Sequence, residues 1–440
     1  MNRPVKRLVV VATGPRLYRE FMLRQIGERY EVHLVIGRPV DWEAPYIASA
    51  AVVPGMTTGG IVAAVREVVA RVAADGVMTW AEDHVVDTAL AAAAVGLPGA
   101  GPDAARACRD KHATRSALAA YAADQHATRS ALADQLTTRS ALAADGTGRR
   151  GVPQPQSVLV GDLAEALAAA DKFGFPVVVK PRAGVASQAV ALVRDGGELA
   201  DHFASAHRLP AAGLPSADRF VLIEEYLTGP EVAVDCVVQD GRVTPVFVSH
   251  KEMGFAPYFE ETGHWTDGDD PLLGDPAIAG FLDQVHAAVG YETGATHTEF
   301  KLTDEGPKLI EINGRLGGDL LSYLCHCASG VDPGLALAAV SCGDAPDLTR
   351  TRALCSGIRF AYPPWHETRI EEIAFSADGL PPEADLAVPL VGPGEVVLLP
   401  HKDLMEGRVA FATATAAGRE EVSAALDRSL AALRCAWSPA

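Results

Sequence analysis

The stretch HTEFKLTDEGPKLIEINGRLGGD, residues 297–319, decides the fold of this chain. Two runs in which apolar and polar residues alternate flank the turn sequence DEG, a pattern typical of a β-hairpin. With the turn centred near residue 305, Glu299 and Glu311 each lie six residues from the centre, and alternation puts His297 on the face of Glu299. We therefore expect the two carboxylates to face each other roughly 5 Å apart, where they repel unless a cation separates them.

A divalent cation between these acids is the first interpretation of the hairpin. On the second strand, Asn313 shares the face of Glu311. Two carboxylates and an amide oxygen are hard ligands of the kind that Mg²⁺ prefers while it also holds substrate phosphates. The alternative is a solvated polar face on which Lys301 and Arg315 neutralise the acids.

A second feature is Lys180, which ends the apolar strand FPVVVK and enters the loop PRAGVASQAV, residues 181–190. Small residues let backbone N–H groups approach a phosphate while the lysine supplies positive charge. This arrangement predicts a phosphate clamp, although many lysines end strands with no such function. Downstream, VLIEEYLTGPE (residues 221–231) reads by itself as a strand and a turn.

Residues 109–148 contain nearly the same phrase three times, as KHATRSALA, QHATRSALA and LTTRSALAA. The spacing between copies is irregular, which excludes a solenoid repeat. The alanine and leucine content predicts a helix with a protruding or mobile extension. Only the first copy follows an Asp-Lys pair, so whatever chemistry Lys111 performs is present once.

The bulk composition excludes several classes of protein. The chain has 440 residues and a formal charge of −18, so a nucleic acid backbone or an anionic membrane surface would be repelled on average. No apolar run approaches the roughly 20 residues of a membrane span, and the N-terminal apolar run is too short for a signal peptide. Seven cysteines without CxxC pairs fit a reducing cytoplasm, and CHC at 325–327 is interpreted as buried thiols rather than a zinc site.

The order of predicted elements indicates α/β followed by α+β organisation. Residues 1–108 alternate short strands with helices, which predicts a parallel sheet covered by helices, and no GxGxxG follows the first strand. Residues 109–227 and 228–345 form the middle of the chain, in which hairpins are predicted around Asp240 and near residue 305. Residues 346–440 are predicted to be rich in β-strands and to end in the helix REEVSAALDRSLAALR.

In this order, the pieces DK, VVVKP with its loop, EEYLTGPE, and TEF with IEINGR resemble the ATP-grasp superfamily from about residue 80 to 340. The resemblance implies an N-terminal Rossmann-like parallel sheet at 1–108, a small ATP-binding lobe at 109–227, and a large lobe with the metal site at 228–345. It also makes part of the repeat, about 119–148, an insertion copied from the helix body. That insertion is either a tolerated duplication or a lid or oligomer contact.

The resemblance implies ATP and Mg²⁺ (or Mn²⁺) as reaction partners. Lys111 and Lys180 match the lysines that hold the phosphates, and Ala186 and Ser187 lie in the loop that closes over them. That loop has less glycine than is usual in similar proteins, so its closure is expected to be slower or differently shaped. The remaining matches comprise the adenine hinge, the ribose acid, the magnesium ligands and the arginine that steadies the transferred phosphoryl group, namely Glu224, Glu225, Tyr226, Leu227, Glu231, Glu299, Glu311, Asn313 and Arg315.

Within the superfamily, YFEETGHWTDG and TWAEDHVVDTALAAAAVGLPG are similar to segments of L-amino acid ligases and related carboxylate–amine ligases. This similarity implies that Glu82 and Glu261 line an amine site and that His264 and Arg315 face the substrate carboxylate or its acyl phosphate. For Glu82 and Glu261, exposed surface acids are the equal alternative.

The expected function is therefore an ATP- and Mg²⁺-dependent ligase in the cytoplasm that activates a carboxylate as an acyl phosphate and couples it to an amine, with amino acids as substrates. Small molecules are the expected partners, nucleic acid and membranes are not, and homo-oligomerisation is left open. The alternatives are a bicarbonate-phosphorylating carboxylase of the same fold and a non-catalytic ATP-binding protein.

Overall fold

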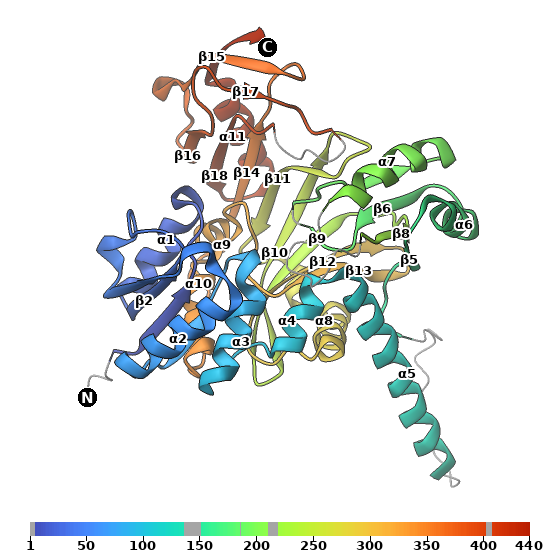
Figure 1. Cartoon of the computed structure of the whole chain (residues 1–440). Helices are drawn as coiled ribbons and strands as arrows, with labels where there is room; N and C mark the ends of the chain where they lie inside the picture. The colour runs from blue at the N-terminus through green and yellow to red at the C-terminus, as the bar shows by residue number, and fades with distance from the viewer. Residues whose placement is uncertain (1–4, 136–150, 185, 210–218, 402–406) are drawn as a thin grey trace.

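The computed structural model describes residues 5–135, 151–184, 186–209, 219–401 and 407–440. Figure 1 shows a parallel α/β unit at the N-terminus, a large central antiparallel sheet, a small sheet beside it, and a C-terminal unit at the far end. Within the described ranges, no helix combines the length and apolar character that crossing a membrane requires.

The N-terminal unit is the predicted parallel sheet, with strand order β3-β2-β1-β4. Its strands are apolar because helices cover both faces. Helices α1 and α10 (Pro333–Ser341) pack on one side, and α2 and α3 pack on the other. The strands are β1 (Arg7–Val11), β2 (Glu31–Ile36), β3 (Ser49–Val52) and β4 (Gly76–Met78), and the helices are α1 (Arg16–Gly27), α2 (Thr58–Val72), α3 (Val85–Val95) and α4 (Pro102–Arg109). Short 3-10 helices lie at Ala44–Tyr46, Pro54–Met56 and Glu82–His84.

Helix α5 (Lys111–Gln135) carries the first two copies of the repeat and projects away from the body of the molecule (Figure 1). The predicted insertion at about 119–148 is therefore helical as far as Gln135. Its remaining residues, 136–148, lie outside the described residues.

The small sheet is antiparallel, with order β5-β8-β6-β7. Helices α6 and α7 pack on it and enclose a valine- and alanine-rich core. Its elements are β5 (Ser157–Val160), α6 (Leu163–Phe173), β6 (Val177–Pro181), β7 (Ala191–Val193), α7 (Gly196–Arg208) and β8 (Val221–Glu225). Lys180 lies near the end of β6, as the sequence predicts.

The central sheet has eight antiparallel strands in the order β13-β12-β9-β10-β11-β14-β18-β16. Side chains alternate along β9. Val232, Val234 and Cys236 pack against α8 on one face of the sheet, and Val237 packs against α9 and α10 on the other. Its elements are β9 (Glu231–Gln239), β10 (Arg242–Gly254), β11 (Glu260–Asp267), a 3-10 helix (Pro271–Gly274), α8 (Pro276–Val289), β12 (Gly294–Thr303), β13 (Gly306–Asn313), α9 (Leu321–Ser329), α10 (Pro333–Ser341), β14 (Cys355–Ala361), β16 (Ala384–Pro389) and β18 (Ala410–Ala416). Both predicted hairpins are confirmed, since β9 pairs with β10 around Asp240 and β12 pairs with β13.

The C-terminal unit adds a three-stranded sheet of order β17-β15-β19 and a helix that packs on β14 and β18. The predicted final helix is too long: α11 (Arg419–Ala431) is followed by an unpredicted strand, β19 (Leu433–Pro439). The short strand β17 (Val396–Val397) pairs with β15 (Thr368–Phe375), and a 3-10 helix lies at Ala377–Gly379.

The seven cysteines are free, and five of them are buried. Cys325 and Cys327 lie on α9, and the interpretation of CHC as buried thiols holds for Cys325, whereas Cys327 is only half-buried.

Candidate active site

A cavity of about 700 Å³ lies where the small sheet, the central sheet and the C-terminal unit meet. It is lined by every residue that the sequence singled out for a site, although these residues span more than half of the chain. They are Glu82, Lys111, Lys180, Ala186, Ser187, Glu224, Glu225, Tyr226, Leu227, Glu231, Glu261, His264, Glu299, Glu311, Asn313 and Arg315. The surface alternative for Glu82 and Glu261 is therefore wrong, because both carboxylates border this cavity.

The hairpin that carries the paired acids has the predicted opposition. Glu299 faces Glu311, and the next pair along the strands is His297 with Asn313. The turn is one-half residue off the predicted centre, since β12 ends at Thr303 and β13 begins at Gly306. An irregularity beyond Glu299, where Phe300 pairs with Leu309, restores the opposition of the two acids.

Lysines from distant segments neutralise the two acids. Lys111 Nζ donates to Glu311 Oε1 at 2.9 Å, and Lys251 Nζ donates to Glu299 Oε2 at 2.7 Å. The alternative prediction, in which Lys301 and Arg315 neutralise the pair, differs from the structure. Lys301 lies 3.5 Å from Glu231, and Arg315 pairs with Glu82. Each of the opposed acids thus has a lysine partner, and of the two lysines Lys111 borders the cavity.

Lys251 is the main functional candidate that the sequence did not reveal. Its side chain is only 2% exposed, and its ammonium lies 2.6 Å from Glu261, 2.7 Å from Glu299 and 3.0 Å from Glu231. Burial by itself lowers the pKa of Lys251, but the three carboxylates outweigh burial and raise it well above its ordinary value. Conversely, although burial raises the pKa of Glu299 and Glu261, Lys251 holds both pKa values well below their usual range.

Glu224 is the centre of a second acid–base cluster, which is enclosed. Arg115 donates to both carboxylate oxygens at 2.9 and 3.2 Å, and Lys180 Nζ lies 2.5 Å from Oε2. Burial raises the pKa of Glu224, yet the charges of Arg115 and Lys180 lower it to about 2 overall. Its backbone is also committed to the sheet, since Glu224 pairs with Ser157 on one side and with Val178 on the other.

The loop after β6 takes a backbone shape that usually requires glycine. Ala186, Ser187 and Ala189 have φ values of 50°, 53° and 53°. For non-glycine residues this left-handed region costs roughly 1–2 kcal/mol per residue. The glycine-poor loop thus keeps left-handed turns at alanine and serine, with strain stored at the cavity.

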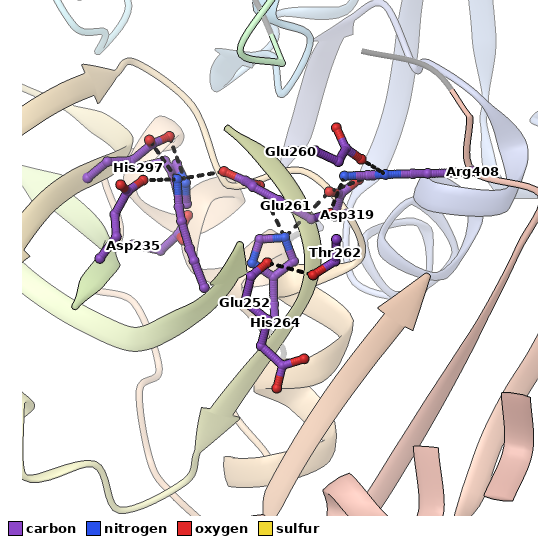
Figure 2. Close-up of polar contacts among 12 residues, drawn as sticks. Asp235, Glu252, Glu260, Glu261, Thr262, His264, His297, Asp319 and Arg408 are labelled. Carbon is purple, nitrogen blue, oxygen red and sulfur yellow. Dashed lines mark hydrogen bonds and ion pairs between the residues drawn. The ribbon is translucent and has the colours of Figure 1, made fainter. Parts of the chain in front are cut away.

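The opposite end of the cavity holds a cluster around His264 (Figure 2). Figure 2 shows its ring between Glu261 and Asp319, with Nε2 at 3.2 Å from Glu261 Oε2 and 3.5 Å from Asp319 Oδ2. The side chain is 1% exposed, and neither ring nitrogen has the geometry of a hydrogen bond to a described residue. Burial lowers the pKa of His264, but the two carboxylates raise it overall.

Arg408 ties the C-terminal unit to this cluster. Its guanidinium donates to both oxygens of Asp319 at 2.9 and 2.8 Å and to Glu260 at 2.8 Å (Figure 2). The guanidinium also stacks over the ring of Phe360. Such bidentate pairs fix orientation as well as charge. Asp319 belongs to the quoted motif, whereas no local pattern marks Arg408, which lies 89 residues further along the chain.

Glu82 is held by two guanidinium groups, those of Arg109 and Arg315. Although burial raises the pKa of Glu82, the two arginines keep it lowered overall. The structure therefore brings Glu82 and Arg315 into direct contact.

The donor set of the hairpin fits a hard divalent cation. Glu299, Glu311 and Asn313 offer oxygen atoms on the cavity side, and both acids now bind ammonium groups, which shows that this position attracts cations. Among the described residues, two further sets of ligand atoms lie within 4.8 Å of one another: Glu231, Glu261 and Glu299, and the group Glu261, His264 and Asp319.

Residues 173–323 match the model of the ATP-grasp domain. The chain carries an ATP-grasp domain. The whole structure also superposes on the crystal structure of an L-amino acid ligase from Bacillus licheniformis, with a TM-score of 0.73 and 21% identity over 99% of this chain and 100% of that one. The fold is thus the ATP-grasp fold, with the predicted N-terminal parallel sheet, and the resemblance seen in the sequence is confirmed.

Two curated relatives of the ATP-grasp domain are named for joining or making small molecules. Carnosine synthase 1 of Homo sapiens is 29% identical over 294 residues, which cover 63% of this chain and 32% of that protein. Alanine–anticapsin ligase of Bacillus subtilis is 25% identical over 264 residues, or 56% of this chain and 49% of that protein. The matched region thus spans half or less of these relatives.

Proposed function

We propose that this protein is an ATP- and Mg²⁺-dependent ligase that activates a carboxylate as an acyl phosphate and couples it to an amine. The observation that carries the proposal is the opposition of Glu299 and Glu311 on a cavity that Lys111 and Lys180 also border. Phosphoryl transfer depends mainly on positioning and charge neutralisation. It therefore needs acids that bind a cation and lysines that bind phosphates, and this cavity has two of each.

At the nucleotide end, we assign the phosphates to Lys111 and Lys180 and the covering loop to Ala186 and Ser187. Glu224 anchors Lys180, so one ammonium is already fixed beside the cavity before the nucleotide arrives. The adenine is assigned to the hinge of residues 224–227, where Tyr226 and Leu227 follow the end of β8 and all four residues line the cavity. The ribose is assigned to Glu231.

Magnesium would be held by Glu299, Glu311 and Asn313, and would supply charge neutralisation for the nucleotide phosphates. With Glu311 bound to magnesium, the ammonium of Lys111, which donates to Glu311 in this structure, would be free to donate to a phosphate oxygen. Arg315 lies at the same edge and supplies a further fixed positive charge for the transferred phosphoryl group.

The proposed reaction has two steps. A carboxylate oxygen of the first substrate attacks the terminal phosphorus of ATP, and ADP leaves. The amine nitrogen of the second substrate then attacks the acyl carbon, phosphate leaves, and the amine proton is lost, which gives an amide. Glu261 and Glu82 are assigned to the amine end, and His264 and Arg315 to the carboxylate or acyl phosphate.

Amino acids are the proposed substrates because relatives with the same domain carry the names alanine–anticapsin ligase and carnosine synthase 1. The lining of the cavity is compatible with amino acids, which have both polar and apolar groups. It includes the polar side chains of Glu261, His264 and Arg408 and the apolar side chains of Leu321 and Val397. We also propose that residues 1–108, 109–227, 228–345 and 346–440 are the functional units of the chain.

The test is release of ADP and phosphate with a panel of amino acids, singly and in pairs, and with bicarbonate. The ligase predicts release that needs two substrates and an amide product detected by mass spectrometry. Release with bicarbonate alone would instead support a carboxylase. Nucleotide binding without turnover on any panel member would support a non-catalytic ATP-binding protein.

A further inference from the structure

A buried carboxylate lies behind the metal position, on the strand next to the acidic hairpin. Asp235 interrupts the apolar sequence EVAVDCVV of β9 and is 0% exposed. A charged group at such a position is costly unless specific partners compensate it. Its two oxygens do have different partners, and each partner leads to a residue of the proposed site.

One oxygen of Asp235 leads to a proposed metal ligand. Oδ2 lies 2.9 Å from His297 Nδ1, with hydrogen-bond geometry, and the other ring nitrogen, Nε2, lies 3.3 Å from Glu299 Oε1 (Figure 2 shows His297 beside Asp235). The strand register makes this contact unavoidable, because His297 is the direct partner of Asp235 on β9 and of Asn313 on β13. The imidazole thus spans from the buried carboxylate to the cavity.

The other oxygen leads to the loop of the arginine. Oδ1 accepts a hydrogen bond of 2.7 Å from the backbone N–H of Gly317, two residues after Arg315. A side chain at Gly317 is sterically excluded, because its Cβ would lie 2.9 Å from His297 Nδ1 and 2.7 Å from Leu321 Cδ1. The His297 ring and the Gly317 backbone therefore share one close-packed contact with Asp235.

We propose that Asp235 is a positioning residue that fixes two parts of the site at once: Glu299 through His297, and the Arg315 loop through Gly317. The inference rests on the proposed function, since it assumes that Glu299 binds the metal. Partners that orient metal ligands typically change metal affinity by 10–100-fold when they are removed. Asp235 does not line the cavity among the described residues, so it acts through the other two groups.

The test uses Mn²⁺ as the probe, with the full chain and a non-hydrolysable ATP analogue, and follows bound Mn²⁺ by electron paramagnetic resonance. His297→Asn keeps an amide near Asp235 but no longer reaches Glu299, whereas His297→Gln reaches Glu299 but loses Asp235. If both contacts matter, each variant weakens Mn²⁺ binding by at least about 10-fold. Binding of the analogue in EDTA should stay within about twofold of wild type.

The matched control is His286→Gln. His286 is also buried and contacts the strand of His297, through Thr296 at 2.7 Å, but its other ring nitrogen lies against the carbonyl of Leu282, and neither partner is a proposed metal ligand. This control should lower the melting temperature and leave Mn²⁺ affinity unchanged. If the control lost as much Mn²⁺ affinity as the His297 variants, the loss would be explained by general destabilisation, and the inference would be overturned.

Asp235→Ala removes both oxygens and so tests the two branches together. We expect weaker Mn²⁺ binding and, in addition, a kcat that saturating metal does not restore, because the Arg315 loop also loses its hydrogen bond to Asp235; in the His297 variants saturating metal should restore kcat. Wild-type Mn²⁺ affinity in His297→Gln and His297→Asn would overturn the inference, and these two variants decide it if Asp235→Ala fails to fold. Absence of nucleotide-dependent Mn²⁺ binding in the wild type would instead count against the proposed function itself.

Discussion

Two lysines face the same cavity, but their carboxylate partners differ. Lys180 is bound to Glu224, whose side chain is 3% exposed and is also held by Arg115. Lys111 is bound to Glu311, whose side chain is 20% exposed and lies on the cavity. Glu224 thus has two cationic partners and little exposure, whereas Glu311 has one and is more exposed, so we expect the second pair to be the one that opens.

The difference separates a fixed charge from an exchangeable one. Because Glu224 has a second cation, Lys180 can turn spare N–H bonds to a phosphate while its anchor stays in place. Lys111 has to change partner when Glu311 takes a metal ion. We therefore expect Lys180 to bind phosphate from a fixed position and Lys111 to exchange its carboxylate partner for phosphate.

The largest effect is expected when the exchangeable pair is broken. Glu311→Ala removes an oxygen ligand of the proposed metal, so turnover should fall by at least about 10³-fold, equivalent to roughly 4 kcal/mol of transition-state stabilisation. The affinity for Mg·ATP should fall as well. Steady-state ADP release and isothermal titration calorimetry measure the two quantities.

The control for this variant is Glu305→Gln, in the exposed turn of the same hairpin. It should retain wild-type turnover. Unchanged turnover in Glu311→Ala would discard the metal assignment.

Breaking the fixed pair should lower stability, because both of its cations are buried. Glu224→Gln leaves Arg115 and Lys180 as buried cations without their counter-charge, which should lower the free energy of unfolding by about 3 kcal/mol. Urea denaturation followed by circular dichroism measures this change. Glu383→Gln, which breaks the exposed pair with Arg428, should cost less than about 1 kcal/mol; an equal cost in the two variants would contradict the contrast.

The same pair predicts a pH dependence. Its charged partners lower the pKa of Glu224 to about 2, from 4.5, so its contribution to stability is present above pH 4.5 and is lost as the pH falls toward 2. The difference in unfolding free energy between wild type and Glu224→Gln should therefore shrink over this range. A difference that stays constant from pH 5 to pH 3 would show that the carboxylate is not held in its charged form.

The smallest effect is expected in the loop that covers the nucleotide end. Ala186 is exposed and has a φ of 50°, so Ala186→Gly relieves backbone strain and should change the free energy of unfolding by less than about 0.5 kcal/mol. The control Ala168→Gly, at an exposed position of α6, should cost about 1 kcal/mol. Equal costs in thermal denaturation would mean that the loop does not need its left-handed backbone.

The sequence predicted the opposed acids because side chains alternate with period two and the turn is short. It could not predict the irregularity beyond Glu299, which corrects a turn that lies slightly before the expected centre. The prediction of opposition was therefore right although the counted centre was not. The two strands of a hairpin are neighbours in the sequence, so their pairing can be predicted from a local pattern.

Lys251 was missed for a different reason. Lys251 lies near the end of β10, which continues to Gly254, far from the turn at Asp240 that marks the hairpin in the sequence. The three carboxylates that surround Lys251 come from β9, β11 and β12, so only the tertiary arrangement reveals its charge environment. Arg408 and its contact with Asp319 are hidden in the same way, by a separation of 89 residues.

The boundary error at the C-terminus has a non-local cause. The sequence REEVSAALDRSLAALR keeps a helical pattern to its end, but the helix stops at Ala431, and residues from Leu433 pair with β15 instead. Pairing with a distant strand overrides the local helical preference there.

The central claim is that a cation displaces lysine from the paired acids of the hairpin. The most direct test is a crystal structure with Mg²⁺ and a non-hydrolysable ATP analogue. We expect an ion bound by Glu299 and Glu311, and the ammonium of Lys111 on a phosphate oxygen rather than on Glu311. Acids that still bind Lys111 and Lys251, with the nucleotide present and no ion between them, would contradict the account.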